Sequence, residues 1–163
     1  MAPITYYSTN GRADSVTFGQ ALLQGLAPDR GLYMPSEIPR LSLELNASFS
    51  DMSYADIAFH VINAFLQDEI PEETLRSLCR DAYDFEVPLE HVYNRSYVLR
   101  LDRGPTASFK DFAARLMGRL MQYYLERENR SMLILTATSG DTGSAIANAF
   151  YGLDTIDVVI LFP

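Results

Sequence analysis

Three strand-like runs separated by helical stretches dominate the second half of the sequence. They span residues 97–101, 132–136 and 156–162 and are rich in Leu, Ile and Val, as strands buried in a sheet are. The resulting order is strand, helix, strand, helix, strand. This order favours a parallel or mixed sheet with right-handed crossovers, in which ligands bind beyond the carboxyl ends of the strands.

The first ninety residues have mainly helical patterns. Thr17 precedes an apolar run with helical spacing, and Ser53 with Asp56 forms a capping-box-like pair in front of a second run. Pro71, followed by two glutamates, has the composition of a third helix start. The sequence therefore predicts a small, mainly helical N-terminal domain.

A domain boundary is expected where the helical periodicity ends. From residue 85 to residue 94 the apolar spacing is lost, and Pro88 interrupts it further. His91 falls in this predicted linker. We therefore expect two domains, one over residues 1–93 and an α/β domain that starts at residue 94 and runs to residue 163.

The helix predicted over residues 109–128 is polar on only one side. Arg115, Arg119, Gln122 and Glu126 form a single narrow stripe at helical spacing. Most of the circumference of this helix must therefore be buried, which is typical of a helix inside a larger assembly.

Composition excludes several classes of protein. The chain has 163 residues, 48% of them hydrophobic, and a formal net charge of -8. An acidic chain is a poor partner for nucleic acid, since affinity for a phosphate backbone requires clustered cations. No apolar run approaches the ~18 residues of a membrane span, and no targeting leader is visible. Cys79 is the single cysteine, which fits a reducing cytoplasm and leaves no Cys-based metal site.

The first motif joins the run at 97–101 to the buried helix and contains the only lysine of the sequence, Lys110. Ser108 and Asp111 have the spacing of an N-cap residue and an N3 residue, which places Lys110 in the first helical turn. A basic residue there opposes the helix dipole, and this disfavours the ammonium form. Imine formation with an aldehyde requires the neutral amine. From spacing alone, a solvated structural lysine at a helix start is an equally good interpretation.

The second motif spans residues 136–145, between the run at 132–136 and another predicted helix. Hydroxyl groups, Gly140, Gly143 and free backbone amides at a helix N-terminus make an anion site. No lysine follows Gly143, so a phosphate-binding Walker loop is excluded, and the three-glycine dinucleotide pattern is absent. A hydroxyl-capped helix after a glycine turn is the alternative interpretation.

Both motifs resemble those of one enzyme family. Gly-Pro-Thr at residues 104–106, two further residues and then Phe-Lys-Asp at 109–111 is similar to the cofactor-lysine motif of threonine synthases. Thr-Ser-Gly-Asp-Thr-Gly at 138–143 is similar to the substrate-binding loop of the same family, which belongs to fold type II of the pyridoxal-phosphate enzymes. Residues 18–35 resemble the family's N-terminal domain.

The resemblance implies a reaction and a set of site residues. The reaction converts O-phospho-L-homoserine and water to L-threonine and phosphate, with pyridoxal 5'-phosphate held as an internal aldimine on Lys110. The loop that binds the substrate carboxylate would comprise Ser139, Gly140, Asp141, Thr142 and Gly143, with Asp141 also facing the cofactor. The resemblance implies no metal.

We also expect this chain to be an inactive fragment. It contains no further glycine-rich cup for the cofactor phosphate, so the α/β domain that begins at residue 94 is expected to be truncated and the remainder of the enzyme to be missing. Two alternatives stay open. One is a threonine-synthase-like phospho-lyase that releases phosphate without making threonine, and the other is a non-catalytic binding or assembly module.

Overall fold

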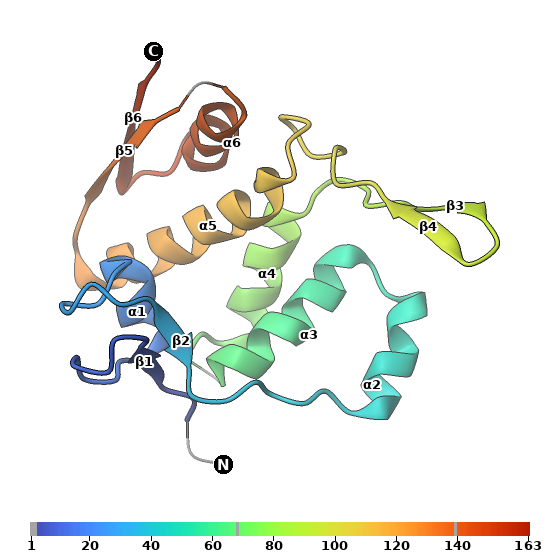
Figure 1. The fold of residues 1–163 in the computed structure, drawn as a ribbon, viewed down its shortest axis with the longest axis horizontal. Coiled ribbons are helices and arrows are strands. Elements are labelled where there is room, and N and C mark those ends of the chain that lie inside the picture. Colours follow the sequence, from blue (N-terminus) through green and yellow to red (C-terminus); the bar gives the residue numbers. More distant parts are fainter. Residues whose placement is uncertain (1–2, 68, 139) are drawn as a thin grey trace. The chain divides into compact units, whose positions relative to one another are not determined.

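A computed structural model describes residues 3–67, 69–138 and 140–163 (Figure 1). The chain divides into two compact units, Met1–Ser77 and Leu78–Pro163, which are described separately below. The division into domains 1–93 and 94–163 stays a prediction.

The first unit is mainly helical, as expected. Strands β1 (Tyr6–Ser8) and β2 (Tyr33–Pro35) pair antiparallel, with Tyr6 opposite Pro35. The helical elements are α1 (Phe18–Gln24), α2 (Leu43–Ser48), the 3-10 turn η1 (Phe49–Asp51), α3 (Tyr54–Leu66) and α4 (Glu72–Ala82), the last of which continues into the second unit.

The expected helix starts at Thr17 and Ser53 are confirmed. Thr17 forms a capping box with Gln20, in which the Gln20 amide donates to the Thr17 hydroxyl at 3.3 Å and the Thr17 amide donates to the Gln20 side chain at 3.1 Å. The Ser53 hydroxyl accepts from the Asp56 amide at 3.1 Å. These bonds satisfy amides that have no partner within the helix, which is why the local sequence signal was sufficient.

The second unit contains a β-hairpin followed by an α/β segment. The hairpin consists of β3 (Leu89–Tyr93) and β4 (Ser96–Leu99). Helix α5 (Lys110–Glu128) follows, and then β5 (Met132–Ala137), α6 (Asp141–Phe150) and β6 (Ile156–Leu161). Strands β5 and β6 are parallel, with Met132 opposite Ile156 and Ala137 opposite Leu161, so α6 is the crossover helix. The mixed α/β class with a parallel sheet is confirmed.

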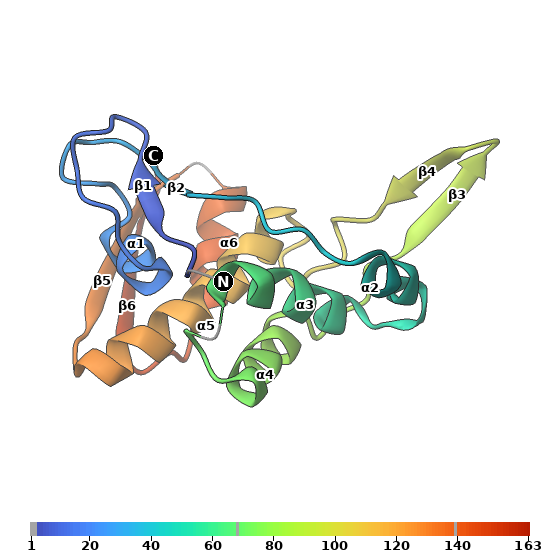
Figure 2. The same cartoon turned by 90° about the horizontal axis from the view of Figure 1, so that it is seen from below.

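The expectation that residues 97–101 begin the parallel sheet is wrong. Residues 97–99 belong to β4, which ends at Leu99 and pairs antiparallel with β3, so that Leu89 lies opposite Leu99. The predicted linker around His91 is therefore the first strand of a hairpin. Asn94 adopts φ = 51°, and a residue in this left-handed region closes a short turn that brings neighbouring strands together locally. Figure 2 shows the hairpin extending away from α5 and α6, and every residue of both strands is exposed.

Helices α5 and α6 pack closely against each other. At Gly118 of α5, a Cβ atom would lie 3.1 Å from the carbonyl oxygen of Ala149 and 3.2 Å from the Leu153 side chain. The prediction that α5 is buried around most of its circumference is confirmed by its eight buried residues, which are Asp111, Ala114, Arg115, Leu116, Gly118, Leu120, Met121 and Leu125.

The position of Arg115 departs from the predicted polar stripe, since this side chain is buried. Its Nε donates to the carbonyl oxygen of Ala82 at 2.7 Å, and its Nη2 donates to the carbonyl oxygen of Asp81 at 3.0 Å and to Asp84 Oδ1 at 2.7 Å. Nη1 lies 3.4 Å from Asn148 Oδ1 on α6. The guanidinium thus satisfies carbonyls at the C-terminus of α4, where the helix dipole also favours a cation.

Candidate active site

Lys110 is the first residue of α5 and is half-buried. Its Nζ atom lies 4.5 Å from the centroid of the Phe109 ring. Within the described residues, this amine makes no ion pair and no hydrogen bond to a side chain or a carbonyl. The residue is thus partly shielded from solvent, and the amine contacts an aromatic ring rather than a carboxylate or a carbonyl of the described residues.

The predicted placement of Ser108 and Asp111 as N-cap and N3 residues of this helix is wrong. The N-cap position is occupied by Phe109, whose side chain makes no cap hydrogen bond. The Ser108 hydroxyl accepts from the Lys110 amide at 3.3 Å, a long contact, and the Asp111 amide donates to the Ser108 carbonyl oxygen at 3.0 Å. The Asp111 carboxylate does not reach back to the N-cap amide, because it is held by another residue.

Asp111 binds the turn that precedes the helix. This side chain is fully buried, and its two oxygens accept from Thr106, one from the amide at 2.9 Å and one from the hydroxyl at 2.6 Å. Gly104 packs directly on the same carboxylate, since a Cβ at position 104 would overlap Asp111 Oδ2. Gly104 and Thr106, at one end of the first motif, thus contact Asp111 at its other end. The spacing of the motif does not predict this contact.

The two residues between these parts turn the chain sharply. Ala107 adopts φ = 56°, in the left-handed region, and its amide donates to the Gly104 carbonyl oxygen at 3.0 Å. Such a conformation costs a non-glycine residue about 1–2 kcal/mol. The contact between Thr106 and Asp111 closes this turn against the start of α5.

The second motif lies between the C-terminus of β5 and the N-terminus of α6, as predicted. The Thr138 amide continues the sheet by donating to the Leu161 carbonyl oxygen at 3.0 Å, and α6 begins at Asp141 with Gly140 as its N-cap residue. The predicted substrate-binding residue Ser139 lies outside the described residues. Asp141 is exposed and Thr142 is half-buried. No described residue accepts a hydrogen bond from the amides of residues 141–143, so this end of α6 can receive an anion.

The two glycines of this motif have different environments. A Cβ at Gly140 would meet nothing within 4 Å, so its backbone is open to a ligand. A Cβ at Gly143 would lie 2.5 Å from Thr138 Cγ2 and 3.1 Å from Ile160 Cγ2. Glycine at position 143 is therefore required for packing α6 on the sheet, and this reason is independent of any ligand.

The helices that carry the two motifs are neighbours, as Figure 1 shows, and they meet at Gly118 and Ala149. No hydrogen bond or ion pair joins Lys110 to Thr138 or to residues 140–143 within the described part of the chain. The sequence-predicted residues thus lie on adjacent elements without direct polar contact.

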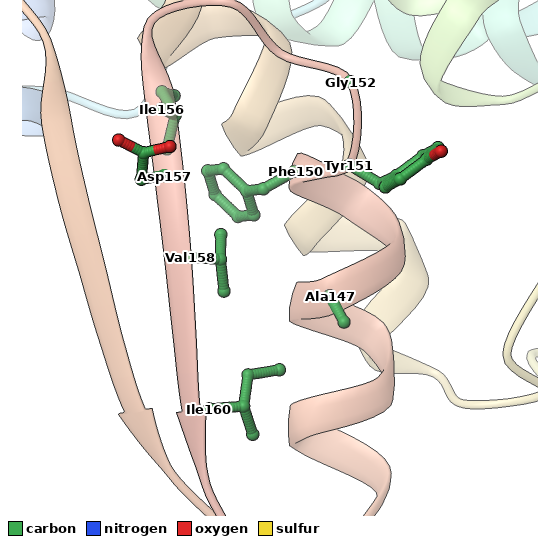
Figure 3. A pocket seen from close by; sticks show the side chains of 8 residues that line it. All are labelled: Ala147, Phe150, Tyr151, Gly152, Ile156, Asp157, Val158 and Ile160. Carbon is green, nitrogen blue, oxygen red and sulfur yellow. The ribbon is translucent and has the colours of Figure 1, made fainter.

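A cavity of about 320 Å³ lies between β6 and the C-terminal end of α6 (Figure 3). Phe150, Ile156, Val158 and Ile160 give it a mainly apolar lining. It contains neither Lys110 nor the turn at the start of α6.

Among the described residues there is no group of three or more His, Cys, Asp or Glu side chains placed to hold a metal ion. In the same residues, no helix has the length and apolarity to cross a membrane.

Comparison with known protein families gives a match over the first part of the chain. Residues 5–83 match the family model described as threonine synthase N terminus. Threonine synthase of Pseudomonas aeruginosa is 38% identical over 163 residues, which cover 97% of this chain and 35% of that protein. Threonine synthase of Escherichia coli is 38% identical over 157 residues, which cover 96% of this chain and 36% of the relative.

Solved structures agree with these matches. The crystal structure of threonine synthase from Brucella melitensis with pyridoxal phosphate bound superposes with a TM-score of 0.94 at 41% identity and covers 98% of this chain. The Escherichia coli enzyme superposes with a TM-score of 0.86 at 38% identity. This chain spans 36% and 37% of those two chains, roughly a third of their length. By sequence and by fold, it belongs to the threonine synthase family and corresponds to the N-terminal part of its members.

Proposed function

We propose that this chain provides the cofactor lysine, Lys110, and the substrate-carboxylate loop of a threonine synthase. The reaction is the conversion of O-phospho-L-homoserine and water to L-threonine and phosphate. A lyase reaction class, a role in threonine biosynthesis and a cytoplasmic location are part of this proposal.

The environment of Lys110 is the observation that carries the proposal. It is the only lysine of the sequence, it is half-buried, and within the described residues its amine has no carboxylate or carbonyl partner. An amine with no such partner is available for condensation with an aldehyde. These features fit pyridoxal phosphate, which is bound in the Brucella melitensis relative.

The chain's own residues would then bind, orient and move protons. The amides of residues 141–143 at the start of α6 would hold the substrate carboxylate, with Ser139 and Gly140 as further predicted members of this loop and Asp141 directed toward the cofactor. The Lys110 amine would remove a proton from the substrate α carbon and return one during the later steps. Pyridoxal phosphate, when bound, supplies the electron-withdrawing ring that makes this proton acidic.

We expect these 163 residues to be inactive by themselves. They provide one glycine-containing anion site, at the start of α6, and it is assigned to the substrate. About two thirds of the length of each relative lies outside the part that this chain matches, and further binding groups can lie there. Release of phosphate from O-phosphohomoserine by the purified chain would contradict this part of the proposal.

Reductive trapping tests the lysine directly. The purified chain is incubated with pyridoxal phosphate, reduced with borohydride and analysed by peptide mapping, with Lys110→Ala as the matched control. We expect one adduct on Lys110 in addition to any on the N-terminal amine, and none at position 110 in the control. An adduct confined to the N-terminal amine would refute the assignment of Lys110.

A chimera tests the reaction. The first third of the Escherichia coli relative, which is 38% identical, would be replaced by this chain and assayed for threonine and phosphate. We expect both products, with activity lost in Lys110→Ala. Phosphate without threonine would favour the phospho-lyase alternative, and neither product from a folded, cofactor-loaded chimera would favour a non-catalytic module.

A further inference from the structure

We infer that Asp111 is a positioning residue for Lys110, acting through its two hydrogen bonds to Thr106. The inference rests on the proposed function of Lys110 and replaces the helix-start role that spacing predicted for Asp111 with a role toward the lysine. It is based on the different contacts that the Lys110 amine and the Asp111 carboxylate make at the start of α5.

Lys110 and Asp111 are adjacent in sequence, yet they are not paired with each other. Both carboxylate oxygens of Asp111 accept from Thr106, at 2.9 and 2.6 Å, and the side chain is fully buried. The Lys110 amine lies over the Phe109 ring instead. Within the described residues Asp111 makes no ion pair, although a carboxylate this deeply buried normally has a cationic partner.

This arrangement has two effects on Lys110. First, both oxygens of the carboxylate accept from Thr106, and within the described residues neither pairs with the Lys110 amine. Second, the contact fixes the turn from Gly104 to Thr106 against the first turn of α5, from which the lysine side chain leaves. Gly104 contributes to the same contact, because any side chain at position 104 would displace the Asp111 carboxylate.

Three substitutions distinguish an effect on the position of Lys110 from an effect of the Asp111 charge and from an effect on the stability of the chain. Thr106→Ser keeps both hydrogen bonds and is the matched control. Thr106→Val has nearly the same shape but removes the hydroxyl donor. Asp111→Asn removes the charge and can keep both contacts, because its amide oxygen accepts from the Thr106 amide while its NH₂ group donates to the hydroxyl oxygen.

The measurement is the rate of pyridoxal-phosphate adduct formation at Lys110 in the full 163-residue chain. Each rate is divided by the folded fraction from urea denaturation, and the N-terminal amine of the same molecule serves as internal reference. We expect Thr106→Ser and Asp111→Asn to react at the wild-type rate and Thr106→Val about tenfold more slowly, as for a loss of ~1.4 kcal/mol. Equal rates in all four chains would overturn the inference and leave the proposed function intact. A loss in Asp111→Asn as large as in Thr106→Val would also overturn it, since charge would then be responsible.

A second readout does not depend on the cofactor. Isotope labelling of lysine gives a single side-chain signal, because Lys110 is the only lysine. We expect its two ε protons to be inequivalent in the wild type and in Thr106→Ser, as in a side chain of fixed orientation, and to become equivalent in Thr106→Val. If the wild type forms no adduct, the proposed function fails, and the positioning role is still decided by this spectrum: unchanged signals in Thr106→Val refute it.

Discussion

Replacement of Arg115 by methionine tests how the C-terminus of α4 is attached to α5. Methionine keeps most of the length and the apolar stem of the side chain but removes every donor. The Ala82 carbonyl oxygen, which accepts from Nε at 2.7 Å, would lose that donor inside a residue that is fully buried. The Asp81 carbonyl oxygen would lose a bond of 3.0 Å at a more exposed position.

The size of the effect follows from the burial of each partner. A buried carbonyl left without a donor costs ~1–3 kcal/mol. The ion pair to Asp84 adds little, because the Asp84 side chain is 65% exposed and such pairs contribute roughly 0–1 kcal/mol. We therefore expect Arg115→Met to lower the free energy of unfolding by about 1–4 kcal/mol, a large part of the 5–15 kcal/mol typical of a domain.

Urea denaturation followed by far-ultraviolet circular dichroism measures this change. Arg119→Met, one turn further along α5, is the matched control. Burial lowers the pKa of the Arg119 guanidinium, and the charge of Arg115 lowers it further, so its removal relieves repulsion. The control loses one hydrogen bond, from Arg119 Nη1 to the Arg115 carbonyl oxygen at 3.0 Å, so we expect it to cost no more than about 1 kcal/mol. Equal losses in Arg115→Met and Arg119→Met would refute the reasoning, as would an equal loss in Asp84→Asn, which would assign the effect to the exposed pair.

Three further predictions concern single positions. Gly118→Ala should lower the free energy of unfolding in urea by ~1–3 kcal/mol despite the better helix propensity of alanine, since its Cβ would press on the Ala149 carbonyl; a more stable variant would refute the close packing. Ala107→Gly should raise the free energy of unfolding slightly, by ~0.5–1 kcal/mol, because φ = 56° strains alanine; a lower value would show that the strain is absent. The hydrogen bond from Ser8 lowers the pKa of Asp29 below its ordinary value, so its contribution is full above about pH 4 and is lost as the pH falls through the folded-state pKa. Wild-type stability should therefore drop more steeply than that of Asp29→Asn on acidification, and parallel curves would contradict this assignment.

Local signals in the sequence were sufficient where the structure is determined by neighbouring residues. Thr17 and Ser53 cap helices because their hydroxyls reach amides three residues away, which the spacing alone specifies. The parallel pair β5 and β6 with α6 between them also follows from the order of apolar runs.

Contacts between distant or competing partners could not be predicted in this way. The run at residues 97–101 has the composition of a sheet strand, but the turn at Asn94 gives it a nearer partner in β3. Asp111 has the spacing of a capping residue, yet Thr106 competes successfully for both of its oxygens. Arg115 looks like one more polar residue of a stripe, and only the position of α4 shows why it is buried. In the candidate site the lysine was found from its motif, whereas the contact that holds its turn was not.

The hairpin of β3 and β4 has a practical consequence for work with this chain. A two-stranded ribbon without packing on either face contributes little to cooperative unfolding, and its amides should exchange with solvent faster than those of α5. Its tip at Asn94 and Arg95, where both residues are exposed, is thus a tolerant place for insertion of an affinity tag or a fluorophore.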